Sequence, residues 1–236
     1  MAKRRFLPHI PLPSRVEHTL DSALDKALAV QRPAVLTYLN RARENNPRMT
    51  PAELEKQLER HYRRAVMGIG GASGAAAALP GAGTAASLAS GAAEITAFIS
   101  ASAMYVLALA ELHEVPVSDP HIRRALVLSV LVGEGGAAIV AGTTSGEVHW
   151  AKVLGKSTSK EKIAGINGRL GRMLLTRFGT RQGALLFGRA LPLGVGAGVG
   201  AFGNAALARG ITKNAGKAFG PPPNRFPARV VDVEPV

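Results

Sequence analysis

Residues 65–110 read AVMGIGGASGAAAALPGAGTAASLASGAAEITAFISASAMYVLALA. Glu94 is the only charged residue in this stretch, and Ala, Gly and Ser dominate it. Pro80 and Gly81 interrupt it, because proline ends a helix and glycine favours a turn. The stretch therefore predicts a hairpin of two uncharged helices.

Apolar residues at helical spacing predict further helices before this stretch. One helix is expected from Ser14 to Gln31, where Pro33 ends it, and a second from Pro33 to about Asn45. A third has a capping signal in Thr50-Pro51-Ala52-Glu53, since Thr caps, Pro takes the first helical position and Glu closes the box. The N-terminal third is therefore expected to be helical.

The remainder of the chain also shows helical signals. Asp119 can cap a helix over HIRRALVLSVLVG, and a short helix is expected in the following EGGAAIVAGTTSG. Ile163, Ile166, Leu170 and Leu174 form an apolar stripe within the segment 152–181. A last uncharged, Gly-rich helix is expected over residues 190–208. The fold class is therefore all-α, a helical bundle with Gly/Ala-rich, closely packed central helices.

One domain is expected, because 236 residues suffice for a single core. Residues 1–13 carry three prolines and a Lys-Arg-Arg run, which is typical of a disordered basic arm. Residues 14–219 form the predicted domain. Residues 220–236 begin with Gly-Pro-Pro-Pro and are expected to be a disordered tail.

Glycines four residues apart let two helix backbones approach closely, which offsets the roughly 1 kcal/mol that each costs in helix propensity. Such close contacts occur in membranes and in soluble bundles alike. The glycines expected at these contacts are Gly70, Gly74, Gly196, Gly200 and Gly203.

No catalytic constellation is evident. Gly198-x-Gly200-x-x-Gly203 lacks the preceding β-branched strand of a dinucleotide site, and Gly155-Lys156-Ser157 lacks the first glycine of a P-loop, since Trp150 occupies that position. The six histidines are scattered, and the chain has no Cys. We therefore expect no catalytic residue, no cofactor, no metal site and no enzyme activity.

Glu94 is the one ionisable group of the uncharged hairpin. A carboxylate on an apolar helix is costly unless it meets a partner, a cavity or water. Three arrangements remain open: a pair with an arginine, a place in a polar pocket, or a solvated helix face.

The 29 Lys and Arg exceed the 16 Asp and Glu by 13 charges, which favours anionic partners. The segment 152–181 contains a single acid, Glu161, and is the strongest candidate for a surface that contacts anionic lipid. Its eight basic residues are Lys152, Lys156, Lys160, Lys162, Arg169, Arg172, Arg177 and Arg181.

The distribution of basic residues limits the number of membrane crossings. Segments before Ala65 and after Lys152 are both basic, so an even number of spans is expected between them. Residues 95–110 are apolar but shorter than the roughly 20 residues of a span. One hairpin or none satisfies these constraints, and the sequence leaves open whether it crosses or only enters the bilayer.

Residues 50–220 resemble the EcsC-type family of bacterial proteins in two places. The first is the Gly-rich stretch that leads through Glu94 towards Tyr105, and the second is the block with Pro192, Gly194, Gly196, Gly200 and Asn204. This resemblance implies membrane association without established catalytic residues. It also draws attention to Glu94, Tyr105 and Asn204 as a polar pocket, although the family position of Glu94 commonly holds Asp.

These observations predict a membrane-associated helical scaffold or accessory factor at the cytoplasmic face of the cell membrane. Its expected partner is anionic membrane lipid, together with a membrane protein or a second copy of the chain. A soluble nucleic-acid-binding protein is the alternative that the charge allows, although few aromatics are present for base stacking. A carrier that holds a lipid-like ligand with Glu94 and Asn204 is the third candidate.

Overall fold

The structure is a computed structural model of the chain. The structure describes residues 24–25, 27–28, 32–77, 84–141, 149–154, 159–189 and 195–228. Within these ranges the side chains of residues 32, 73–77, 84–92, 141, 153, 177–189 and 195–202 are not described. The described residues form eight helices, α2 to α9, and no strand, which confirms the all-α fold class.

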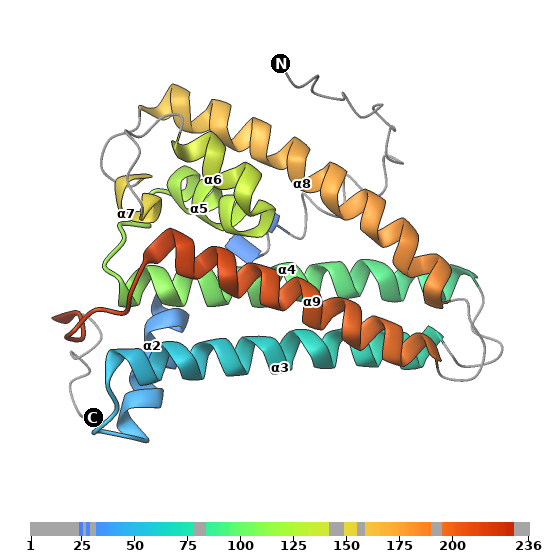
Figure 1. Ribbon diagram of the computed structural model, residues 1–236, viewed down its shortest axis with the longest axis horizontal. Helices are drawn as coiled ribbons and strands as arrows, with labels where there is room; N and C mark the ends of the chain where they lie inside the picture. Colours follow the sequence, from blue (N-terminus) through green and yellow to red (C-terminus); the bar gives the residue numbers. More distant parts are fainter. Residues whose placement is uncertain are drawn as a thin grey trace, which may run out of the picture.

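Three long helices form the centre of the bundle: α3 (Pro51–Ala77), α4 (Thr84–Leu112) and α9 (Val195–Phe219). Figure 1 shows that α3 runs antiparallel to the other two, and α3 packs against both of them. The predicted capping box starts α3, since Thr50 and Glu53 exchange backbone and side-chain hydrogen bonds of 2.7 to 3.3 Å.

Five shorter or peripheral helices surround this centre: α2 (Arg32–Glu44), α5 (Pro120–Val132), α6 (Glu134–Ala141), α7 (Trp150–Leu154) and α8 (Lys160–Arg189). Asp119 caps α5 as predicted, accepting a hydrogen bond of 2.7 Å from the backbone N–H of His121. Helix α8 buries the predicted stripe of Ile163, Ile166, Leu170 and Leu174. It continues beyond the expected end to Arg189, as α9 does beyond residue 208.

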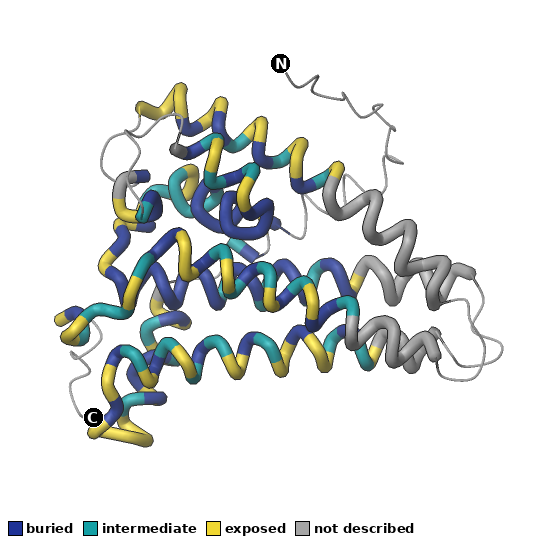
Figure 2. Tube along the Cα trace, in the orientation of Figure 1, coloured by how far each residue is buried: buried dark blue, intermediate teal, exposed yellow. Residues whose placement is uncertain are grey.

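Helix α4 is the core helix of the described bundle. Its segment Ala93–Leu112 is the one stretch of the described residues that is long and apolar enough to cross a membrane, and 72% of this segment is buried inside the protein. Packing against α2, α3, α5 and α9 covers it, as the dark blue of Figure 2 shows. Protein packing is therefore sufficient to account for the apolar character of residues 93–112.

The first residues of the C-terminal tail, 220–228, lie within the described part of the chain. Gly220 adopts a positive φ of 81° and lies so close to the His149 ring that an added Cβ would stand 2.6 Å from it. The chain then folds back, so that the Phe226 ring lies beneath the Arg43 guanidinium at 4.1 Å. Residues 220–228 therefore pack on the helices, while residues 229–236 and the predicted basic arm lie outside the described residues.

Candidate functional site

Glu94 and Asn204 meet in the core although 110 residues separate them. The Asn204 side-chain amide donates to Glu94 Oε1 at 3.1 Å and to the backbone carbonyl of Val66 at 3.3 Å. Glu94 is 5% exposed and Asn204 is 3% exposed. Of the arrangements that the sequence left open, the solvated face is therefore wrong, and this polar contact joins α3, α4 and α9.

Tyr105 does not belong to the same contact. It lies eleven residues beyond Glu94, which is about 16 Å along a helix. Its ring stacks on Tyr62, with centroids 4.6 Å apart and planes 8° apart, and the Tyr62 hydroxyl is hydrogen-bonded to Ser102 at 2.9 Å. Burial raises the pKa of both tyrosines. The structure thus brings together two of the three residues expected in a polar pocket.

The predicted glycine contacts concern the interface of α3 with α9. Gly70 is buried and Gly203 is partly buried. Because Val66 meets Asn204 between antiparallel helices, Gly70 and Gly200 stand one turn further along, at a common level. Gly74 and Gly196 follow at the next turn, in residues whose burial is not described. Other glycines of α3 have no such role, since nothing lies within 4 Å of a Cβ added at Gly68 or Gly71.

The basic residues predicted to contact anionic lipid largely follow the outer face of α8. Lys160, Lys162, Arg169 and Arg172 are exposed there, and Lys152 is exposed on α7. Lys156 lies outside the described residues, as do the side chains of Arg177 and Arg181. We call these four exposed Lys and Arg of α8 the α8 basic face. Met173 is 36% exposed, and its terminal methyl lies against Gly135 of α6.

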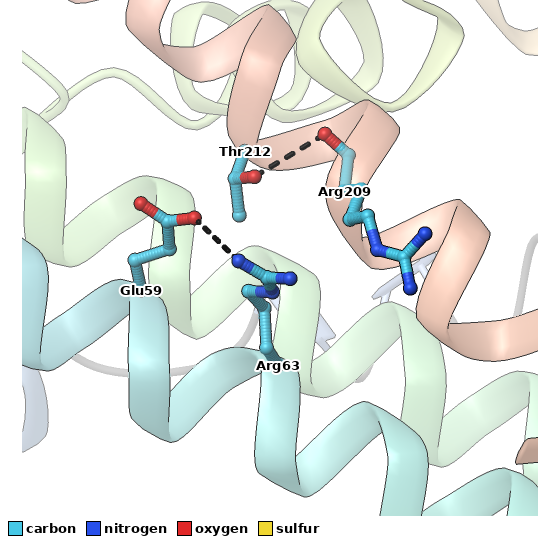
Figure 3. A network of polar contacts seen from close by, with 4 residues as sticks. All are labelled: Glu59, Arg63, Arg209 and Thr212. Atoms are coloured by element: carbon cyan, nitrogen blue, oxygen red, sulfur yellow. Dashed lines mark hydrogen bonds and ion pairs between the residues drawn. The ribbon is translucent and has the colours of Figure 1, made fainter. Parts of the chain in front are cut away.

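A second group of bases lies where α3 and α9 meet. Figure 3 shows Glu59 and Arg63 on α3, facing Arg209 and Thr212 on α9. Arg63 forms an ion pair of 3.3 Å with Glu59, one turn earlier on the same helix. Arg209 is exposed, and the Thr212 hydroxyl donates to its backbone carbonyl at 3.2 Å. Only the tertiary structure brings these arginines together, because 146 residues separate them.

A small cavity of about 240 Å³ lies between α5, α6, α7 and α9, and Ser129, Trp150, Asn214 and Lys217 contribute to its lining. Two of its polar side chains are paired, whereas the buried Ser129 hydroxyl has no hydrogen-bond partner among the described residues. Asn214 donates to the Val130 carbonyl at 3.1 Å, and Lys217 forms an ion pair of 3.1 Å with Glu134.

Other polar clusters in the described part of the chain are small. His113 is buried, contacts Glu55 at 3.1 Å and lies against the Phe219 ring. The described residues contain no group of three or more His, Cys, Asp or Glu side chains that could hold a metal ion.

Comparison with known proteins gives no relative. No family model matches the chain, and no curated protein and no solved structure shows a significant match. The resemblance to the EcsC-type family therefore stays a prediction.

Proposed function

We propose that this protein associates with the anionic surface of a membrane, as an EcsC-type scaffold or accessory factor at the cytoplasmic face of the cell membrane. The observation that supports the proposal most directly is the α8 basic face. Its four exposed Lys and Arg stand on one helix with a single exposed acid, Glu161. Each such base near an anionic surface contributes about 1 kcal/mol to binding.

Burial of α4 favours attachment from one side over crossing. Glu94 and Glu111 lie near the two ends of the segment Ala93–Leu112, and both are buried within the protein. A crossing would require the surrounding helices to leave this core helix and expose it to lipid. Peripheral attachment by the α8 basic face needs no such rearrangement.

Binding to vesicles tests the proposal. We expect sedimentation with vesicles of phosphatidylglycerol and phosphatidylcholine, no sedimentation with phosphatidylcholine alone, and loss of binding as salt screens the charges. Replacing Arg169 and Arg172 by Gln should weaken binding by about tenfold or more, since two contributions of about 1 kcal/mol are removed. The matched control is replacement of Arg41 and Arg48 by Gln, because both are exposed at the other side of the bundle.

The alternatives make different predictions in the same assay. Salt-sensitive binding to DNA without binding to anionic vesicles would contradict the proposal and support the nucleic-acid alternative. The described Phe, Tyr and Trp side chains disfavour binding of single-stranded nucleic acid, because none of them is exposed for stacking on bases. The lipid-carrier alternative requires Glu94 and Asn204 to contact a ligand, whereas the Asn204 amide already donates a hydrogen bond to Glu94.

A further inference from the structure

The cavity between α5, α6, α7 and α9 extends from solvent into the core. Ser129 of α5 is 0% exposed and Trp150 of α7 is 5% exposed, although both contribute to the cavity lining. Glu134 of α6 and Lys217 of α9 line it as well, and their side chains are largely exposed. Figure 1 shows these three short helices and the second half of α9 together at one side of the bundle. The cavity thus has charged groups at its mouth and a hydroxyl at its buried end.

The Ser129 hydroxyl lacks the bonds that a comparable serine makes. Serine hydroxyls within helices commonly bond to the carbonyl one turn earlier. Ser102 of α4 is equally buried, donates to the Phe98 carbonyl at 2.7 Å and is hydrogen-bonded to the Tyr62 hydroxyl at 2.9 Å. Ser129 has no hydrogen-bond partner among the described residues. Because a buried hydroxyl without a partner is destabilising, a polar group that enters the cavity would offset this cost.

Asn214 places an acceptor in the same cavity. Its side-chain nitrogen donates to the carbonyl of Val130, the residue after Ser129, at 3.1 Å. This bond fixes which end of the amide is the nitrogen. The amide oxygen accepts no hydrogen bond from the described residues. Ser129 and Asn214 therefore offer a donor and an acceptor, which together suit a ligand hydroxyl.

The mouth of the cavity carries a net positive charge. Lys217 Nζ lies 3.1 Å from Glu134 Oε1. The hydrogen bond from Lys217 lowers the pKa of the Glu134 carboxyl, and the charges of Lys217 and Lys213 lower it further. Two lysines therefore stand near one carboxylate, which leaves one positive charge for an anionic ligand. A lysine ammonium is a common partner of phosphate groups.

We propose that this cavity binds a small hydroxylated phosphate ester, with its phosphate at Lys217 and a hydroxyl between Ser129 and Asn214. The carbon chain of the ligand lies against the Trp150 ring, as is common in small-molecule sites. The cavity volume of about 240 Å³ equals that of roughly eight liquid water molecules, so a ligand of about ten non-hydrogen atoms fits. Glycerol phosphate has this size, and it occurs as a free solute and as the headgroup of phosphatidylglycerol. The inference goes beyond the proposed membrane association and does not depend on it.

Trp150 provides a direct measurement of binding. It is the only tryptophan of the chain, so its fluorescence reports on this cavity without a label. We expect sn-glycerol 3-phosphate to change the emission saturably, with an affinity that falls as salt rises. Glycerol and inorganic phosphate each lack one of the two recognised groups, so both should bind at least tenfold more weakly. No saturable change with sn-glycerol 3-phosphate or with phosphatidylglycerol vesicles would overturn the inference.

Two substitutions test the assigned contacts. Ser129→Ala and Lys217→Gln should each weaken binding of sn-glycerol 3-phosphate by tenfold or more. Lys56→Gln is the control for charge, because Lys56 is exposed on α3 and does not line the cavity. Circular dichroism verifies that all three variants are helical. Binding that is unchanged in Ser129→Ala would overturn the assignment of the site.

Stability separates a binding role of Ser129 from a structural one. Without ligand, Ser129→Ala should unfold at an unchanged or higher temperature, because it removes a buried hydroxyl that has no partner. Ser102→Ala is the matched control and should behave in the opposite way. It loses two hydrogen bonds, so its unfolding temperature should fall while its affinity for sn-glycerol 3-phosphate stays unchanged. A lower unfolding temperature of Ser129→Ala would indicate a structural hydroxyl and contradict the proposal.

Vesicles distinguish the two sources of the ligand. A change of Trp150 emission with free sn-glycerol 3-phosphate alone assigns a solute, and a change with phosphatidylglycerol vesicles alone assigns a lipid headgroup. Either change has to disappear in Ser129→Ala, and a change that persists there contradicts the site. Sedimentation that depends on Arg169 and Arg172 but not on Ser129 would support membrane association by the α8 basic face alone. Failure of this site is therefore distinguishable from failure of the proposed function.

Discussion

At the scale of single residues, the contact between Glu94 and Asn204 is the most consequential feature of the core. A buried acid is tolerated only where hydrogen bonds replace its hydration. Asn204 supplies one such bond to Glu94 and another to the Val66 carbonyl, so a single amide connects three helices. This contact explains how an otherwise uncharged helix hairpin accommodates a carboxyl group.

Removing the amide should therefore destabilise the fold. Asn204→Ala is expected to lower the free energy of unfolding by about 2 kcal/mol, since both acceptors lose a buried donor. Asn214→Ala is the control, because that amide donates one hydrogen bond at a partly buried position. Denaturant unfolding followed by circular dichroism measures the unfolding free energy of both variants. Equal losses would show that the buried Asn204 contact stabilises the fold no more than the partly buried Asn214 contact.

The stacked tyrosines predict how stability depends on alkaline pH. Burial raises the pKa of Tyr62 and Tyr105 in the folded protein, whereas an unfolded tyrosine ionises near pH 10. Above pH 10 the unfolded chain therefore loses protons that the folded protein keeps. The unfolding free energy is fully retained below pH 10 and should fall above it, by about 1.4 kcal/mol per pH unit for each tyrosine.

Unfolding midpoints between pH 9 and pH 11.5 would show this fall. The double variant Tyr62→Phe with Tyr105→Phe cannot ionise at these positions, so its midpoint should depend less on pH. An unchanged pH dependence in that variant would assign the fall to other groups, such as lysines.

At the scale of helices, the glycines divide into those that packing requires and those that it does not. A Cβ at Gly136 of α6 would lie 2.5 Å from the Ser129 carbonyl oxygen of α5, whereas a Cβ at Gly168 of α8 would meet nothing within 4 Å. The α5–α6 contact therefore depends on a missing side chain. High glycine content alone does not reveal which helices approach closely.

Two alanine substitutions should consequently change stability in opposite directions. Gly136→Ala is expected to destabilise by about 1–3 kcal/mol, because α6 has to move away from α5. Gly168→Ala should stabilise by about 0.5–1 kcal/mol through helix propensity. Thermal unfolding of the two variants measures both effects, and stabilisation by Gly136→Ala would contradict the close approach.

At the scale of the whole molecule, the residues that follow α9 pack against α2 through Phe226. Phe226 is partly buried against the core, and the Arg43 guanidinium lies over its ring. This contact connects α2 with the residues that follow α9.

Removal of the ring should destabilise the bundle more than removal of the cation above it. We expect Phe226→Ala to lower the unfolding free energy by about 1–2 kcal/mol, through lost apolar burial, and Arg43→Gln by at most about 1 kcal/mol. Chemical denaturation of both variants tests this order. No effect of Phe226→Ala would indicate that the segment does not stabilise the fold.

The sequence by itself determined the features that depend on neighbours within one or two helical turns. The capping box at Thr50, the cap at Asp119 and the buried stripe from Ile163 to Leu174 all follow from local hydrogen bonds and the 3.6-residue period. The tertiary structure alone decided which distant residues meet. Arg209 faces Arg63, Tyr105 stacks on Tyr62, and Phe226 packs against Arg43 of α2. Composition does not encode these contacts, because they depend on the register of packed helices and on which surfaces remain available for burial.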